Sequence, residues 1–170
     1  VEIDNLLASL AAKDKQYTDA IAAGDQLFAA QSYGDALAIF SQASSIKPNE
    51  AYPKQKITEI NGILAKQKQA EAAYANYISL ADAAFSSNKL EQAKGQYQAA
   101  SGVKPNEQYP KNRIVEIDKL LAEQALLASQ KQKLESQYKS IIATADLNYN
   151  QKKYQEAKTA YAQASRLKAS

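Results

Sequence analysis

The side chains that carry most enzyme chemistry are missing from this sequence. It contains no His and no Cys, which excludes His-based catalytic triads, thiol nucleophiles and thiolate metal sites. No glycine-rich phosphate loop and no Asp-x-Asp calcium loop occurs. Lys and carboxylate side chains remain, but no recognisable pattern clusters two unlike titratable groups. We therefore expect no enzymatic activity, no cofactor, no metal site and no small-molecule substrate.

Three recurring acidic residues, Asp25, Asp82 and Asp146, are the first candidates for a binding site. They would form a row of carboxylates on a concave face, selecting a basic or hydrogen-bonding ligand. Alternatively, each bonds the backbone of the neighbouring repeat or a Lys, and its role is structural. The residues by themselves leave both interpretations open.

Tyrosine is the other abundant functional side chain, with 11 Tyr against 3 Phe. Tyr33, Tyr97, Tyr154 and Tyr161 lie on an apolar stripe, so we expect them mainly in the core. Tyr52 and Tyr109 each precede a Pro, and we expect them to pack over the start of a helix. Candidate partner-binding residues beside the three aspartates are Tyr77, Tyr154, Tyr161 and Leu167.

The charge balance favours a protein partner. Net charge is +3, from 21 basic and 18 acidic residues. Lys pairs are interspersed with acids, whereas nucleic-acid binding needs a concentrated basic stripe, so we expect no nucleic-acid partner. No apolar run approaches the roughly 18–20 residues that span a bilayer, so we expect no membrane span.

An internal repeat organises the chain. The segment Lys47–Lys54 (KPNEAYPK) returns as Lys104–Lys111 (KPNEQYPK), at an offset of 104 − 47 = 57 residues. We infer one continuous array of three units, at approximately 1–57, 58–114 and 115–170. Each unit also carries five stripe residues with the spacing 3, 4, 3, 3, which predicts a short helix. The stripes are Tyr33-Ala36-Phe40-Ala43-Ile46, Leu90-Ala93-Tyr97-Ala100-Val103 and Tyr154-Ala157-Tyr161-Ala164-Leu167.

The third unit is longer by one heptad. Phe40 and Tyr97 are separated by 97 − 40 = 57 residues, but Tyr97 and Tyr161 by 161 − 97 = 64. Seven residues are two helical turns with a drift of only about 20°, so the insertion indicates one continuous helix from Pro110 to about Tyr149. We predict long helices near 1–30, 53–86 and 110–149, and short helices near 33–46, 89–103 and 153–167.

These elements predict an all-α fold, an antiparallel helix-pair solenoid of alternating long and short helices. Only 5 Gly and 4 Pro interrupt a chain rich in helix formers. Each short helix is long enough to cover only the rear half of its long partner. The fronts of the long helices are apolar and their middles polar. The fronts would either pack on neighbouring fronts or await another molecule.

The stripe residues resemble the second helix of a tetratricopeptide repeat (TPR), which has aromatic, Ala, aromatic and Ala positions followed by Pro. Those positions are Tyr33, Ala36, Phe40, Ala43 and Pro48 in the first unit. The small residue of the family's first helix falls on Gly24, Ala81 and Ala145, and its large residue on Phe28, Phe85 and Tyr149. The chain departs from the family in its longer period, in the missing Gly between helices and in Ala169 at the last Pro position.

The resemblance implies a scaffold for protein–protein interaction. TPR domains that clamp a peptide C-terminal carboxylate resemble one another in having Asn where this chain has Asp25, so a chaperone-tail clamp is not expected. The phrase Lys-Pro-Asn-Glu-x-Tyr-Pro is also similar to repeats in cell-envelope proteins of Bacteroidota-type bacteria, which implies an envelope or extracellular location.

The ends of the array leave two functions open. A solenoid buries its faces by stacking, and no following repeat covers the last stripe. One hypothesis is a protein–protein interaction scaffold, as one segment of a larger protein. The alternative is a structural subunit that self-assembles head-to-tail into a fibre or filament.

Overall fold

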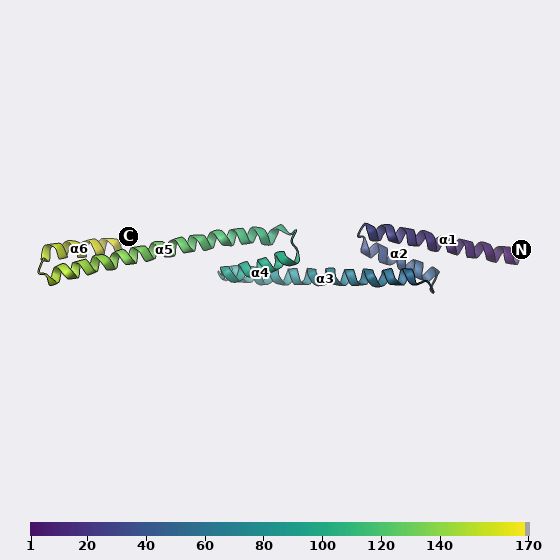
Figure 1. Ribbon diagram of the computed structural model, residues 1–170, viewed down its shortest axis with the longest axis horizontal. Coiled ribbons are helices and arrows are strands. Elements are labelled where there is room, and N and C mark those ends of the chain that lie inside the picture. The colour runs from purple at the N-terminus through teal and green to yellow at the C-terminus, as the bar shows by residue number, and fades with distance from the viewer. Residues whose placement is uncertain (169–170) are drawn as a thin grey trace. The chain divides into compact units, whose positions relative to one another are not determined.

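The computed structural model describes residues 1–168, and these form helices joined by short turns (Figure 1). The helices are α1 (Glu2–Ala29), α2 (Tyr33–Ile46), α3 (Ala51–Ser86), α4 (Leu90–Val103), α5 (Gln108–Asn150) and α6 (Tyr154–Lys168). The predicted all-α class and the alternation of long and short helices are confirmed. Helix α5 runs without a break for 43 residues, as the heptad insertion predicted. The last Pro position, Ala169, lies outside the described residues.

The three long helices end in the same tight turn. Gln31, Asn88 and Lys152 each adopt a left-handed backbone conformation, with φ of 60°, 55° and 60°. In the first turn the Ser32 amide donates to the Leu27 carbonyl at 2.9 Å, and equivalent bonds close the other two. This is the turn that usually carries Gly after a helix. In this chain the same hydrogen bonds close the turn with Gln, Asn or Lys in place of Gly.

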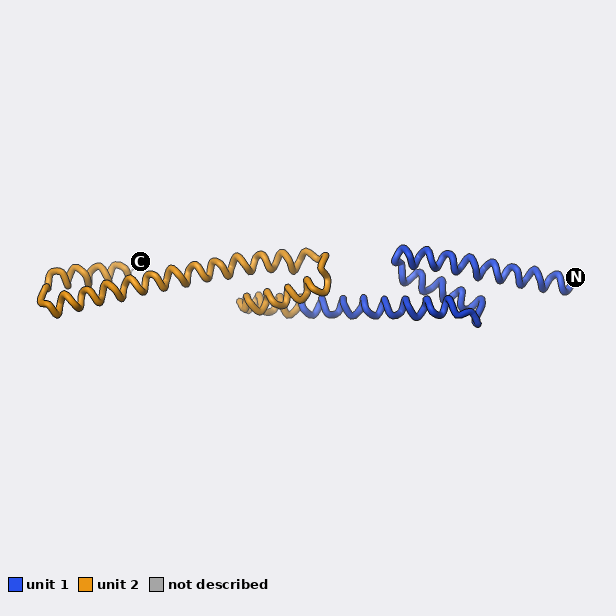
Figure 2. The backbone as a smooth tube through the Cα atoms, viewed as in Figure 1, with its two compact units in different colours: residues 1–77 blue, residues 78–170 orange. Residues whose placement is uncertain are grey.

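The chain forms two compact units, which meet within α3 (Figure 2). The first contains α1, α2 and the front of α3, and its core includes Phe28 and Phe40 with Ile57, Ile60 and Leu64. The second begins at Ile78, and its main core combines the rear of α3 and helix α4 with Ile114, Ile117 and Leu121 from the front of α5.

Within each unit, therefore, the front of a long helix packs on the hairpin that precedes it. The sequence left open whether the fronts pack on neighbouring fronts or await another molecule. The fronts of α3 and α5 do not pack on neighbouring fronts. The front of α1 is different, because Ile3 and Leu7 remain 73% and 59% exposed.

Small residues let the two helices of each hairpin approach closely. Gly24, Ala81 and Ala145 on the long helices are buried, and so are the stripe alanines of all three short helices. The approach is tightest in the first hairpin, where a Cβ on Gly24 would lie 2.8 Å from Cε1 of Phe40. Phe40 is itself fully buried, so its ring has little freedom to move.

This crowding predicts opposite effects for two Gly→Ala substitutions. Gly62 lies inside α3 with nothing within 4 Å of an added Cβ, so Gly62→Ala is expected to raise stability by about 1 kcal/mol through helix propensity. Gly24→Ala gains the same propensity but overpacks the core, at a cost of about 1–3 kcal/mol. Urea unfolding followed by circular dichroism should rank the proteins Gly62→Ala, wild type, Gly24→Ala. Equal stabilisation by both would show that Phe40 moves freely.

Candidate functional site

Each of the three recurring aspartates accepts a hydrogen bond from a tyrosine hydroxyl. Tyr52 donates to Asp25 at 2.6 Å and Tyr109 donates to Asp82 at 2.8 Å. These two tyrosines begin the long helix that follows each hairpin. Asp82 also accepts a bond from Tyr97 of its own hairpin, and Asp146 accepts one from Tyr161.

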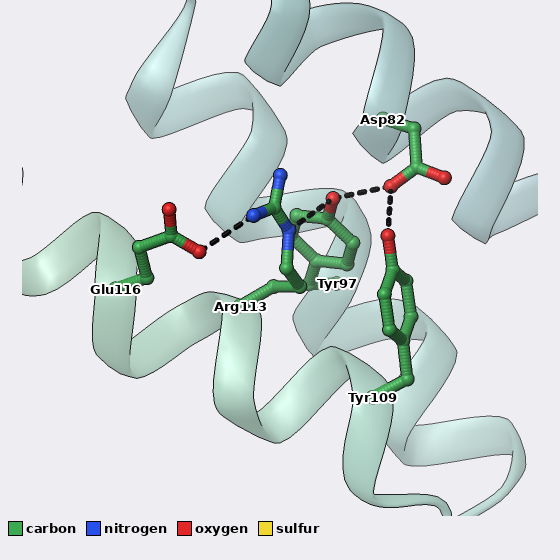
Figure 3. Close-up of polar contacts among 5 residues, drawn as sticks. All are labelled: Asp82, Tyr97, Tyr109, Arg113 and Glu116. Atoms are coloured by element: carbon green, nitrogen blue, oxygen red, sulfur yellow. Dashed lines mark hydrogen bonds and ion pairs between the residues drawn. The ribbon is translucent and has the colours of Figure 1, made fainter.

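The most complete network lies in the second unit (Figure 3). One oxygen of Asp82, Oδ1, accepts bonds from both Tyr97 and Tyr109. Arg113 Nε donates to the Tyr97 hydroxyl at 3.2 Å, and its Nη1 lies 2.5 Å from Glu116 Oε2. The front of α5 is thus connected by hydrogen bonds to α3 and α4 at the point where it crosses them.

The Arg113 guanidinium also stacks over Phe85 of α3, at 3.9 Å from the ring centroid. The first unit repeats this arrangement with Lys56, whose Nζ lies 4.0 Å from the centroid of Phe28. A cation over an aromatic face is favourable by about 0.5–2 kcal/mol. In both units, therefore, a basic residue from the front of the next long helix covers the aromatic residue near the end of the preceding one.

Two tyrosines of these networks, Tyr52 and Tyr97, stay protonated at neutral pH. The bond to Asp25 raises the pKa of Tyr52 from 10.0 to about 12. Burial raises the pKa of Tyr97 further, although the bond from Arg113 opposes the shift. A raised folded-state pKa means that the stabilisation is complete below the unfolded pKa of 10.0 and disappears as pH rises through the folded value. At neutral pH these hydroxyls act as hydrogen-bond donors, which is a structural role.

The third hairpin presents the same side chains to solvent. Tyr149, Tyr154 and Tyr161 are 57%, 58% and 39% exposed, whereas Phe40 and Tyr97, the counterparts of Tyr161, are 0% exposed. The rings of Tyr149 and Tyr154 pair edge-to-face at 5.7 Å, as Phe28 and Tyr33 do at 5.5 Å. We call the surface formed by Asp146, Tyr149, Tyr154 and Tyr161 the open aromatic face.

The predicted site residues lie in different environments in the structure. Asp25 and Asp82 accept hydrogen bonds from tyrosines, a partner different from the backbone or Lys of the structural interpretation. Asp146, Tyr154 and Tyr161 do come together, on the open aromatic face. Leu167 is half-buried further along α6, and Tyr77 is half-buried at the end of the first unit.

The expectation that the stripe tyrosines lie mainly in the core is wrong for Tyr154 and Tyr161. Ala157 and Ala164 of the same stripe are buried against α5, at 2% and 1% exposure. The larger tyrosines contact α5 through the bond from Tyr161 to Asp146 and the pairing of Tyr154 with Tyr149, but α5 does not cover their rings. Within residues 1–168 no third helix covers them, as the front of α3 covers Phe40 in the first unit.

The pairing of tyrosine with aspartate was missed in the sequence. A signal for it exists, because Asp25 and Tyr52 are separated by 52 − 25 = 27 residues and Asp82 and Tyr109 by 109 − 82 = 27. Tyr52 and Tyr109 were expected only to pack over a helix start. The buried residue there is the next one in each case, Pro53 and Pro110.

Comparisons with protein families, curated proteins and solved structures find no match for this chain. Within residues 1–168 no helix has both the length and the apolar character needed to cross a membrane. Over the same range no three metal-ligating side chains cluster together.

The network in the second unit predicts that Asp82→Ala lowers the unfolding free energy more than Asp118→Ala does. Asp82→Ala leaves the buried Tyr97 without its carboxylate acceptor, at an expected cost of about 1–3 kcal/mol in unfolding free energy. Asp118, on the same unit, forms an exposed ion pair with Lys94 at 2.7 Å, and its removal should cost less than about 1 kcal/mol. Urea unfolding measures both. Similar losses would show that the Asp82 network contributes no more than a surface pair.

Proposed function

We propose that this chain is a non-enzymatic scaffold for protein–protein interaction, built from TPR-like helical hairpins arranged as a solenoid. The observation that carries the proposal is the contrast between the hairpins. The aromatic stripe is covered in the first two, at Phe40 and Tyr97, and exposed in the third, at Tyr161. A stripe that needs a covering helix in two places is a surface suited to bind one in the third.

The composition of the open aromatic face supports a protein partner. Tyr is enriched at protein interfaces, because its ring supplies apolar contact area while its hydroxyl supplies a hydrogen bond. Three tyrosines lie here, and Tyr is among the residues that contribute most to binding energy at protein interfaces. The absence of His and Cys is consistent with binding as the whole function.

Site-specific photo-crosslinking tests the scaffold proposal. A photoreactive amino acid in place of the exposed Tyr154 should capture a defined protein in an extract of the cells that make this chain. The matched control places it at Thr159, which is exposed on a different side of α6. Capture at position 154 alone supports the proposal. Equal capture at both positions, or none, would argue against a specific protein-binding face.

A second candidate function is self-assembly end to end, and the front of α1 favours it. Ile3 and Leu7 are exposed there, although Ile60 and Ile117, the counterparts of Ile3, are fully buried against a preceding hairpin. One copy would then place the front of its α1 on the open aromatic face of the next. A contact between two different surfaces that does not close on itself produces filaments.

The mass of the purified chain, measured over a hundredfold concentration range, separates the two candidates. A constant mass near 18.5 kDa is expected for a scaffold that binds a different protein. Growth of mass with concentration, abolished by Tyr161→Glu on the open aromatic face, would instead identify the partner as another copy. Growth that Tyr161→Glu leaves unchanged would contradict both uses of this face.

A further inference from the structure

The third hairpin buries its small residues as the other two do, but within residues 1–168 no third helix lies over its aromatic residues. Ala145, Ala157 and Ala164 are buried between α5 and α6 at 0%, 2% and 1% exposure. The residues that are exposed, Tyr149 and Tyr161, have counterparts that the next long helix covers in the other hairpins. The covered hairpins therefore indicate what the open aromatic face is shaped to bind.

The covering helix has the same sequence pattern in both covered hairpins. Residues 52–60 read YPKQKITEI and residues 109–117 read YPKNRIVEI. The shared pattern is Tyr-Pro, then Lys or Arg four residues after the Tyr, and Ile five and eight residues after it.

Each part of this pattern makes the same contact twice. The Tyr hydroxyl donates to an aspartate at 2.6 Å in one unit and 2.8 Å in the other. The Pro is fully buried, and so is the second Ile, at Ile60 and Ile117. The basic residue lies over a Phe ring at 4.0 Å and 3.9 Å.

The open aromatic face carries counterparts for the Tyr hydroxyl contact and for the cation contact. Asp146 stands where Asp25 and Asp82 accept the Tyr hydroxyl. Tyr149 stands where Phe28 and Phe85 lie under the cation. Tyr161 already donates a hydrogen bond to Asp146 Oδ1. In the second unit Tyr97 donates to Asp82 Oδ1 in the same way, and Asp82 Oδ1 also accepts the bond from Tyr109. Asp146 therefore has the capacity for a second donor.

We propose that the open aromatic face is a docking site for one kind of partner, a protein helix that begins with Tyr-Pro and continues with the basic and Ile residues of this pattern. This inference rests on the proposed scaffold function and names its partner. The helix lies across the α5–α6 hairpin with its Tyr hydroxyl on Asp146, its cation over Tyr149 and its Ile residues against Tyr161.

A second copy of this chain matches the site less well. Tyr-Pro occurs in the sequence only at Tyr52-Pro53 and Tyr109-Pro110, and both are already packed within their own units.

A labelled synthetic peptide with the sequence of residues 108–124 tests the proposal, titrated with the full chain and followed by fluorescence anisotropy. Saturable one-to-one binding is expected. Asp146→Ala in the chain, or Tyr109→Phe in the peptide, should weaken it about tenfold, as loss of a hydrogen bond to a charged group does. Arg113→Gln in the peptide should also weaken it, because the cation over Tyr149 is lost.

Two further variants of the chain test whether the loss of peptide affinity is specific to the open aromatic face. Asp25→Ala removes the equivalent carboxylate in the first unit, where the site is already covered, and should leave peptide affinity unchanged. Should Asp146→Ala lose helical content, Tyr149→Leu serves instead, since Tyr149 is 57% exposed and its ring can be replaced without opening the hairpin core.

Three results would overturn the inference. Binding that Asp146→Ala and Tyr149→Leu both leave unchanged would place the peptide elsewhere. Self-association of the chain that Tyr161→Glu abolishes would make a second copy the partner. Absence of peptide binding, while a photoreactive group at position 154 still captures a protein, would reject the Tyr-Pro helix and leave the scaffold function standing.

Discussion

A helical hairpin of this chain buries its small residues unaided, but its aromatic residues need a third helix. The alanines of each short helix face the long helix beside it and are buried in all three hairpins. Phe40 and Tyr97 also lie against the long helix of their own hairpin, at Gly24 and Asp82. They are fully buried where the front of the next long helix packs over them. Full burial of such a side chain contributes about 1.5–3 kcal/mol.

This constraint explains the unusual length of the long helices. The rear half of α3 pairs with α4, while its front half covers the hairpin made by α1 and α2. Helix α5 divides its two roles in the same way. The polar middle follows, because Gln67 and Lys131 lie between the two packed regions and remain exposed. One helix can therefore contribute to two successive cores.

Directional contacts determine where along the hairpin the covering helix lies. Apolar packing alone is non-directional and tolerates a shift of register. The bond from Tyr109 to Asp82 and the stacking of Arg113 on Phe85 are satisfied in one position only. The buried Pro110 lies in the first turn of α5, where its missing amide proton is not needed. Recognition of the covering helix is therefore specific as well as apolar.

The sequence by itself determined the helices, because their boundaries follow from local signals. The 3, 4, 3, 3 stripe spacing located α2, α4 and α6, and the heptad insertion predicted the unbroken α5. These local signals did not predict whether each stripe residue is buried or exposed. Ala157 and Tyr154 share a stripe, yet the first is buried and the second exposed. Helix α5 alone covers the small Ala157, whereas the Tyr154 ring, paired with Tyr149 of α5, has no third helix over it within residues 1–168. Tyr52 and Asp25 are likewise 27 residues apart, and only the packing of α3 on the first hairpin brings them together. Tertiary structure decided these contacts, since periodicity fixes which side of a helix a residue occupies, but not which helix covers that side.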